Sequence, residues 1–142
     1  MPLRIFLVED STLLLRTLSA ALQELVGVEV VATARSEERA LELMRSNPEG
    51  FDLIVIDIFL VSGSGLGALR GAKALQPQAN VVVLSNYATL EVRKRCIALG
   101  VDRVFEKTRQ IEDFIAYCGK LAETKATAMA EMDDGPPTVP GF

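Results

Sequence analysis

The chain has 142 residues, of which 49% are hydrophobic and 24% are charged, and its formal net charge is −4. This length suits one domain with a buried core, and the negative charge argues against a general nucleic-acid-binding protein. The sequence has no histidine, which excludes a histidine nucleophile, general base or metal ligand. No apolar stretch approaches the roughly 20 residues of a bilayer span, and the N-terminus lacks the pattern of a signal peptide. We therefore expect a cytoplasmic protein without membrane insertion.

Apolar runs and helical periodicities alternate along the chain. Short apolar runs predict strands over residues 3–8, 28–33, 52–57, 81–85 and 101–106. A segment with helical spacing of apolar residues follows each run, and the fifth such segment ends at Ala122. This alternation predicts a parallel sheet with helices on both faces, joined by right-handed crossovers.

The last 20 residues differ in composition from the rest. The stretch 133–137 reads Asp-Asp-Gly-Pro-Pro, which is typical of disorder. We predict a domain over 1–122 and a tail over 123–142 that is partly helical and then disordered. Cys96 and Cys118 lie within helical apolar patterns, so we expect two reduced core residues and neither a disulfide nor a metal site.

Polar side chains lie at the carboxyl ends of four of the predicted strands. Glu9 and Asp10 come after the first strand, Asp57 ends the third, Ser85 ends the fourth and Lys107 comes after the fifth. In open α/β sheets the carboxyl ends of the strands share one edge, where ligands bind. Each residue also has a purely structural explanation, as a helix cap, a turn residue or a solvated charge. We expect their joint placement to form a site.

The residue types at this edge suit phosphoryl transfer. Three neighbouring carboxylates repel one another, and a divalent cation relieves that repulsion. An all-oxygen ligand set without histidine or cysteine favours Mg²⁺. Lys107 can pair with an incoming anion and Ser85 can donate a hydrogen bond to it. A carboxylate such as Asp57 is an established nucleophile in this chemistry.

Four segments of the chain resemble one known family. They are Leu7-Val8-Glu9-Asp10, Ile54-Val55-Ile56-Asp57, Val83-Leu84-Ser85 and Val104-Phe105-Glu106-Lys107. In order and spacing they are similar to the receiver domain of two-component response regulators, in its stand-alone form, over about residues 3–122. The resemblance implies an α/β, flavodoxin-like (βα)5 fold, a doubly wound five-stranded parallel sheet with strand order 2-1-3-4-5.

The resemblance also implies roles at a metal and phosphoryl site. Asp57 is the expected phosphoacceptor. Asp10 and Asp57 are expected to bind Mg²⁺ directly, Glu9 through water, and Phe59 through its backbone carbonyl. No enzyme activity is implied beyond self-phosphorylation from small donors and autodephosphorylation.

A second group of implied roles concerns the switch. Lys107 and Ser85 are expected to bind the phosphoryl group, Ser85 moves inward, and Phe105 rotates into the vacated space. This changes the surface of the fourth helix, fifth strand and fifth helix. The implied partners are a sensor histidine kinase or phosphotransfer protein and a downstream protein effector, with no nucleic acid, and the chain is expected to be a monomer or weak dimer.

Four positions depart from the commonest family sequence. Val61 and Thr108 stand where prolines are usual, and the Lys107–Thr108 bond is therefore expected to be trans, or a strained cis bond held by the site. Phe59 is bulky and Asn86 is larger than usual, so both are predicted to control access and phosphoryl lifetime. These departures keep open an alternative, a degenerate receiver that binds a protein without phosphorylation.

A basic run, Arg93-Lys94-Arg95, lies on the predicted fourth helix. It is either a solvated face or part of the partner surface.

Overall fold

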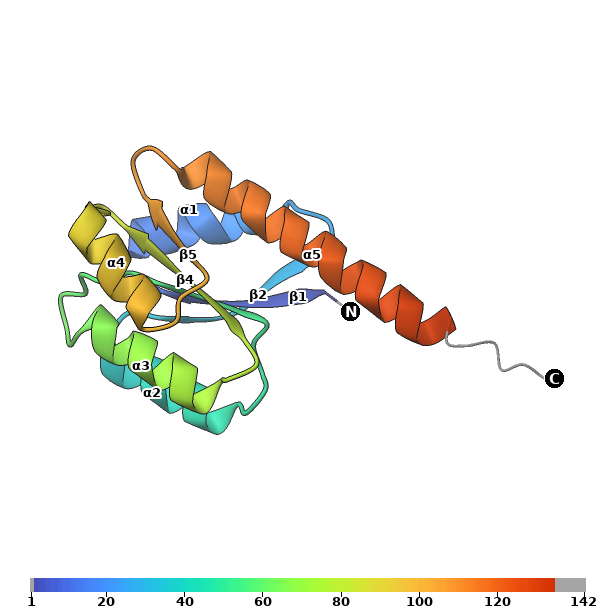
Figure 1. Ribbon diagram of the computed structural model, residues 1–142, viewed down its shortest axis with the longest axis horizontal. Helices are drawn as coiled ribbons and strands as arrows, with labels where there is room; N and C mark the ends of the chain where they lie inside the picture. The colour runs from blue at the N-terminus through green and yellow to red at the C-terminus, as the bar shows by residue number, and fades with distance from the viewer. Residues whose placement is uncertain (1, 135–142) are drawn as a thin grey trace.

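The computed structural model describes residues 2–134, with the backbone alone for 131–134. Five strands and five helices alternate strictly along the chain (Figure 1). They are β1 (Leu3–Val8), α1 (Thr12–Gln23), β2 (Val28–Ala34), α2 (Glu37–Ser46), β3 (Leu53–Ile56), α3 (Gly65–Leu75), β4 (Asn80–Ser85), α4 (Leu90–Ala98), β5 (Arg103–Glu106) and α5 (Ile111–Asp134). All neighbouring strands pair in parallel in the order β2-β1-β3-β4-β5, which confirms the predicted fold.

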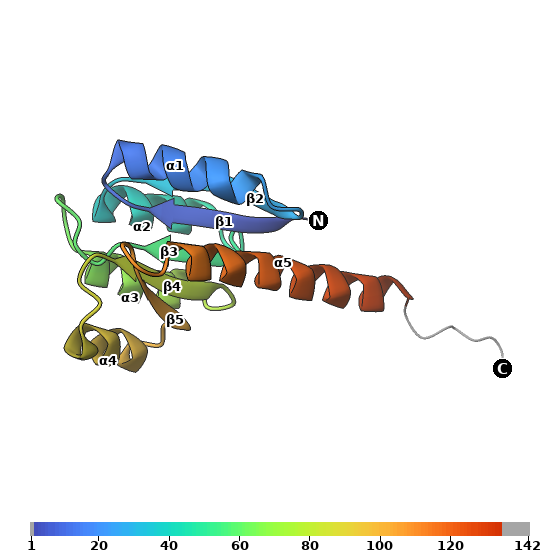
Figure 2. The same ribbon diagram turned by 90° about the horizontal axis from the view of Figure 1, so that it is seen from above.

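Two hydrophobic clusters fill the two faces of the sheet. One cluster joins the sheet to α1 and α5, and the other joins it to α2, α3 and α4. Figure 2 places α4 beside the β5 edge and α1 and α2 toward the β2 edge. The central strand β3 is buried on both sides over its whole length, as its unbroken apolar sequence predicts. Because helices cover both faces of the sheet, the ends of the strands are the part of the sheet that the helices leave uncovered.

The fifth strand is shorter than expected. It begins at Arg103, and the two preceding residues form a loop. Asp102 in that loop accepts a hydrogen bond from Val81 N–H at 2.8 Å, so it caps the start of β4. The Asp102 N–H also donates to Val81 O at 2.8 Å, so the main chain of this residue still bonds to β4 although it lies outside β5.

Helix α5 is longer than the sequence pattern indicates. It continues through Asp134, so Asp133 and Asp134 are helical and the expectation of disorder there is wrong. The predicted disorder from 135 onward lies outside the residues that the structure describes. Lys125 on this extension bonds to Pro2 O at 2.9 Å and to Asp52 Oδ2 at 2.6 Å, which holds the helix against the sheet.

Cys96 and Cys118 are free, buried thiols, as expected. Burial raises the pKa of Cys118 to about 12 and also raises that of Cys96. Among the helices described, none combines the length and apolar character needed to cross a membrane.

Candidate functional site

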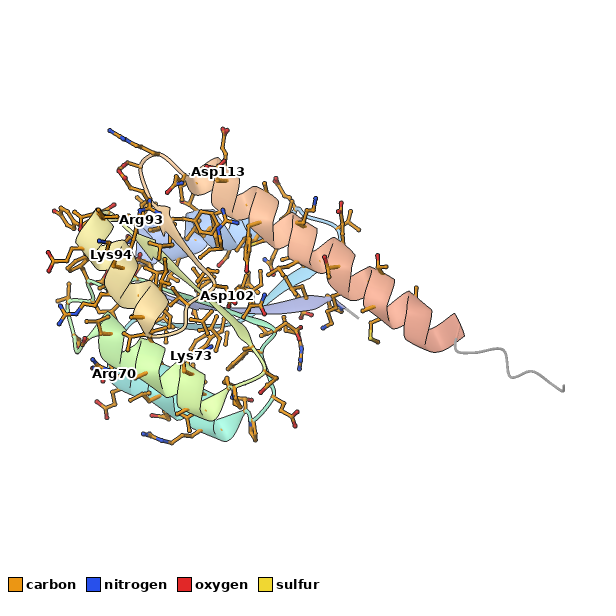
Figure 3. The ribbon with its side chains drawn as sticks, viewed as in Figure 1. Arg70, Lys73, Arg93, Lys94, Asp102 and Asp113 are labelled. Atoms are coloured by element: carbon orange, nitrogen blue, oxygen red, sulfur yellow. The ribbon has the colours of Figure 1, made fainter. Side chains whose placement is uncertain are left out.

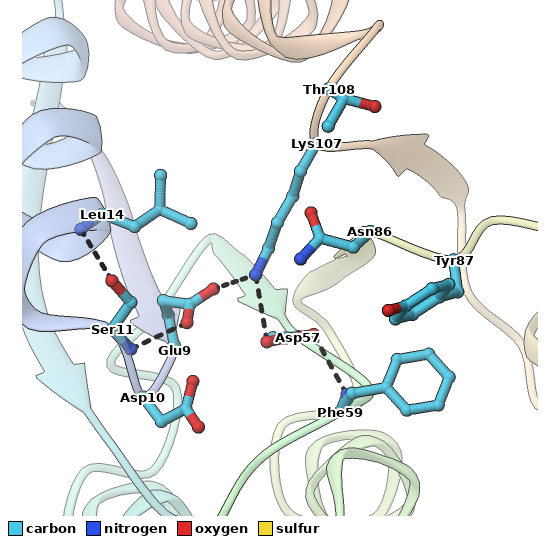
Figure 4. Close-up of a pocket in the computed structure, with 10 residues that line it drawn as sticks. All are labelled: Glu9, Asp10, Ser11, Leu14, Asp57, Phe59, Asn86, Tyr87, Lys107 and Thr108. Atoms are coloured by element: carbon cyan, nitrogen blue, oxygen red, sulfur yellow. Dashed lines mark hydrogen bonds and ion pairs between the residues drawn. The ribbon is translucent and has the colours of Figure 1, made fainter.

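A pocket of about 390 Å³ lies at the carboxyl ends of β1, β3, β4 and β5. The predicted polar residues from β1, β3 and β5 meet in it, although they are far apart in the sequence (Figure 4). Its lining residues are Glu9, Asp10, Ser11, Leu14, Asp57, Phe59, Asn86, Tyr87, Lys107 and Thr108. The strand-end argument therefore predicts correctly that these residues come together at one edge of the sheet.

Asp57 sits one residue past β3 and is nearly buried, with 5% of its surface exposed. Its backbone N–H continues the sheet by donating to Val8 O at 2.9 Å, and Phe59 N–H donates to its Oδ1 at 3.0 Å. Gly65 at the start of α3 packs against the Asp57 carbonyl, where a Cβ would lie 2.2 Å from the oxygen. The strand, the turn and the helix start thus fix the direction of the carboxylate.

Lys107 follows β5 and reaches across the pocket to two carboxylates. Its Nζ lies 3.0 Å from Asp57 Oδ2 and also bonds to Glu9 Oε1. Burial alone acts to lower the pKa of Lys107, but the hydrogen bond to Glu9 and the charge of Asp57 outweigh it and raise the pKa. The ammonium group is therefore held charged beside the Asp57 carboxylate.

Glu9 and Asp10 complete the acidic cluster. Burial raises the pKa of Glu9, against the opposing hydrogen bonds from Lys107 and from Ser11 N–H, which lies 2.8 Å from Oε2. Asp10 Oδ2 accepts from Val61 N–H at 2.8 Å. Burial also acts to raise the pKa of Asp10, but the neighbouring Glu9 and the hydrogen bond from Val61 N–H outweigh burial and lower it.

These carboxylates fit a divalent cation. Glu9, Asp10 and Asp57 each present an oxygen atom within 4.8 Å of the others. The set contains only oxygen donors, which is the set that Mg²⁺ prefers. Both Glu9 oxygens already accept hydrogen bonds from protein groups, whereas no described hydrogen bond reaches Asp10 Oδ1. By this criterion Asp10 is better placed than Glu9 for direct contact with an ion. Both Asp57 oxygens, like those of Glu9, already accept hydrogen bonds, from Phe59 N–H and from Lys107 Nζ.

Ser85 is buried at the end of β4, and its hydroxyl does not line the pocket. Its Oγ accepts a hydrogen bond from Tyr87 N–H at 3.1 Å, so it caps the turn that leads into α4. Because Ser85 is not part of the pocket lining, its hydroxyl would have to move toward the pocket to reach a group beside Asp57, which would disturb this bond.

The rotation expected for Phe105 is contradicted by the sheet geometry. Side chains alternate between faces along a strand, so Ser85 shares the face of Val83, toward α3 and α4. Phe105 points to the other face, where its ring packs against Phe114 and Tyr117 at centroid distances of 5.8 and 5.7 Å. Phe105 therefore cannot fill a space vacated by Ser85. A neighbouring β5 residue, Val104, belongs to the cluster on the Ser85 side.

Two aromatic rings lie at the mouth of the pocket. Phe59, which is half exposed, packs edge-on against Tyr87 at a centroid distance of 5.4 Å. Asn86 lies beside them in the pocket lining, as Figure 4 shows. Tyr87 was not predicted from the sequence, although its place two residues after Ser85 mirrors that of Phe59 after Asp57.

The turn after Lys107 contains no cis bond, since no described peptide bond is cis. Thr108 Oγ1 instead donates to Glu106 Oε1 at 3.0 Å. The Lys107–Thr108 peptide bond is therefore trans, which is the first of the two alternatives expected from the sequence.

The basic run on α4 divides into two kinds of residue. Lys94 and Arg95 are exposed, whereas Arg93 is half buried and bonds to main-chain and side-chain oxygens of the neighbouring segments. A solvated face therefore does not describe Arg93, and the partner surface stays a prediction.

Comparisons with known proteins agree with this geometry. The family model described as "Response regulator receiver domain" matches residues 5–118. A protein-glutamate methylesterase/protein-glutamine glutaminase of Anaeromyxobacter dehalogenans is 36% identical over 110 residues, which cover 76% of this chain and 30% of that protein. A cyclic di-GMP phosphodiesterase of Thermotoga maritima is 29% identical, with coverage of 76% and 28%. The chain thus spans about a third of the length of these curated relatives.

Solved structures share the fold. A CheY-like receiver domain protein of Methanospirillum hungatei has a TM-score of 0.76 and 24% identity, with coverage of 90% of this chain and 99% of that one. A response regulator of Burkholderia pseudomallei has a TM-score of 0.71 and 23% identity, with coverage of 92% and 74%, and was solved with a phosphorylated aspartic acid, a calcium ion and citrate.

Proposed function

The chain belongs to the response regulator receiver domain family of two-component systems, and on that premise we propose that Asp57 accepts a phosphoryl group. One observation supports this most. A single pocket brings together the Asp57 carboxylate, two further carboxylates and the Lys107 ammonium group. Phosphoryl transfer onto a carboxylate requires both a fixed nucleophile and positive charge for the incoming oxygens.

Asp57 would act as the nucleophile. Phe59 N–H and Lys107 Nζ each hold one of its oxygens, so the carboxylate is oriented before a donor arrives. One carboxylate oxygen forms a bond to phosphorus, and the bond from phosphorus to the donor's leaving group breaks. We propose a phosphohistidine of a sensor kinase or phosphotransfer protein as the donor.

Asp10 and Asp57 would hold Mg²⁺ directly, Glu9 through water, and Phe59 through its carbonyl oxygen. The ion, when bound, neutralises charge on the phosphoryl oxygens. Lys107 would give up its bonds to Asp57 and Glu9 and pair with a phosphoryl oxygen instead. Ser85 would donate its hydroxyl hydrogen after it releases Tyr87 N–H.

The modified pocket would signal through the surface that α4, β5 and α5 form. A downstream protein would read that surface, as a population shift between two conformations. The Burkholderia pseudomallei structure, with its phosphorylated aspartic acid and calcium ion, supports the same chemistry here by analogy of fold.

Phosphoryl uptake from acetyl phosphate with Mg²⁺ tests the proposal. Intact mass should show one added phosphate on the wild-type chain and none on Asp57→Asn. Asp113→Asn is the matched control, because Asp113 is an exposed carboxylate in the first turn of α5, away from the pocket lining (Figure 3). Labelling of Asp57→Asn would contradict the assignment.

The degenerate receiver is the alternative that the same experiment addresses. Absence of labelling with acetyl phosphate, together with absence of Mg²⁺ binding by titration, would favour a binding module that works without phosphorylation.

A further inference from the structure

Arg93 on α4 bonds to three separate segments. Its Nε donates to Ala88 O at 3.0 Å, its Nη1 to Val104 O at 2.9 Å, and its Nη2 to Gln110 Oε1 at 2.8 Å. The next residue, Lys94, is exposed (Figure 3). One half-buried guanidinium group therefore joins the β4–α4 turn, β5 and the residue that precedes α5.

Gln110 extends this contact to the turn that carries Lys107. The Oε1 atom that accepts from Arg93 also accepts from Glu106 N–H at 2.9 Å, and Gln110 N–H donates to Glu106 O at 2.8 Å. Thr108 provides none of the rigidity that a proline ring gives a turn. The Gln110 Oε1 atom, which accepts from both Arg93 and Glu106 N–H, holds this turn in place together with the bond from Gln110 N–H to Glu106 O.

The bond to Ala88 links Arg93 to the turn that follows Ser85. The Ser85 hydroxyl accepts from Tyr87 N–H and so fixes the turn that presents the Ala88 carbonyl. A Ser85 hydroxyl that turns toward a group on Asp57 gives up this bond. The position of the Ala88 carbonyl, and with it one of the three acceptors of Arg93, then changes.

We propose that Arg93 is a positioning residue that couples the pocket to α4, by tying this helix to the turn after Ser85 and to the turn that carries Lys107. The inference rests on the proposed function, because the change at Ser85 follows phosphorylation of Asp57. Charge-assisted hydrogen bonds of a planar guanidinium group are directional, so the three acceptors cannot move independently while it is bound to all of them. A shift of either turn therefore moves α4.

Hydrogen exchange of the α4 amides tests this coupling in the full chain. Wild type, Arg93→Gln and Lys94→Gln are compared with Mg²⁺ alone and with Mg²⁺ plus beryllofluoride, a mimic of the phosphoryl group. Lys94→Gln removes the same charge from the same helix. In Arg93→Gln, we expect α4 to exchange about tenfold faster without beryllofluoride, as loss of charge-assisted hydrogen bonds predicts. We also expect its exchange to change little when the mimic binds.

The outcomes separate the two proposals. The coupling is supported if beryllofluoride changes hydrogen exchange in wild type both at residues 57–61 and in α4, and if the change in α4 is lost in Arg93→Gln alone. Retention of the full α4 response in Arg93→Gln overturns the coupling alone. Absence of any wild-type response at 57–61 overturns the proposed function, and the coupling with it. Gln110→Glu, which keeps an oxygen acceptor for both Arg93 and Glu106 N–H, should respond like wild type, and a lost response there also counts against the coupling.

Discussion

Lys107 Nζ lies 3.0 Å from Asp57 Oδ2 and bonds to Glu9 as well, so one ammonium group serves two buried carboxylates. This sharing makes Lys107 a structural residue in addition to its proposed role toward the phosphoryl group. Without it, two acidic side chains in a buried site would face each other with no cation between them.

Lys107→Met should therefore destabilise the fold. We expect the free energy of unfolding to fall by about 1–3 kcal/mol, the cost of leaving buried polar groups without their partner. Mg²⁺ should restore part of the loss by binding the folded state. Urea unfolding with and without Mg²⁺ measures both effects, and Lys94→Met is the exposed control. Equal unfolding midpoints for Lys107→Met and wild type would refute the structural role.

Replacement of Phe59 should shorten the life of the phosphorylated state. The Phe59 and Tyr87 rings pack against each other in the pocket lining, and we predict that they limit the approach of water to Asp57. We expect Phe59→Asn and Asn86→Ala to lose the phosphoryl group severalfold faster than wild type, as followed by intact mass after removal of the donor. Val61→Ala, at an exposed position, should not change the rate. An unchanged rate in Asn86→Ala would remove Asn86 from this account.

Asp52 should make the fold sensitive to acid. Burial acts to raise the pKa of Asp52, but hydrogen bonds from Arg4 and Lys125 outweigh it and lower the pKa from 3.8 to about 2. A carboxylate with a depressed pKa stabilises the fold fully above its ordinary value and loses this contribution as the pH falls toward the folded-state value. The difference in unfolding free energy between wild type and Asp52→Asn should thus be constant above about pH 4 and shrink toward pH 2. A difference independent of pH over this range contradicts the assignment.

Both thiols should resist alkylation in the folded protein. Cys118 is fully buried with a pKa of about 12, and burial also raises the pKa of Cys96, so little reactive thiolate is present or accessible. Iodoacetamide should label neither cysteine in the native state and both in urea, as read by mass. An added cysteine at an exposed site, Ala126→Cys, should label at once and serves as the positive control. Rapid native labelling of Cys118 would show that the α5 face opens locally.

Much of the fold and the pocket is predictable because both follow from the strand ends. An apolar run that stops at a charged residue marks the end of a strand, and parallel topology brings such ends to one edge. Glu9, Asp10, Asp57 and Lys107 meet in the pocket for this reason. Their chemical roles remain predictions.

The face of a side chain on β5 is harder to predict. The segment 101–106 reads Val-Asp-Arg-Val-Phe-Glu, which alternates poorly, so adjacent Val104 and Phe105 are both candidates for either face. Burial settles it, since the larger ring fills the space beside Phe114 under α5. The contacts of Arg93 are equally hard to predict, because the sequence of a basic run does not indicate which side chain turns inward.

The tether of α5 at Lys125 has a mechanical consequence. The helix has 24 residues and is therefore about 36 Å long, and it begins just after the turn that carries Lys107. The bonds from Lys125 to Asp52 and Pro2 act as a fulcrum along the helix. Residues 126–134 extend about 14 Å beyond it, so a tilt of about 5° around this point moves the end of the helix by about 1 Å.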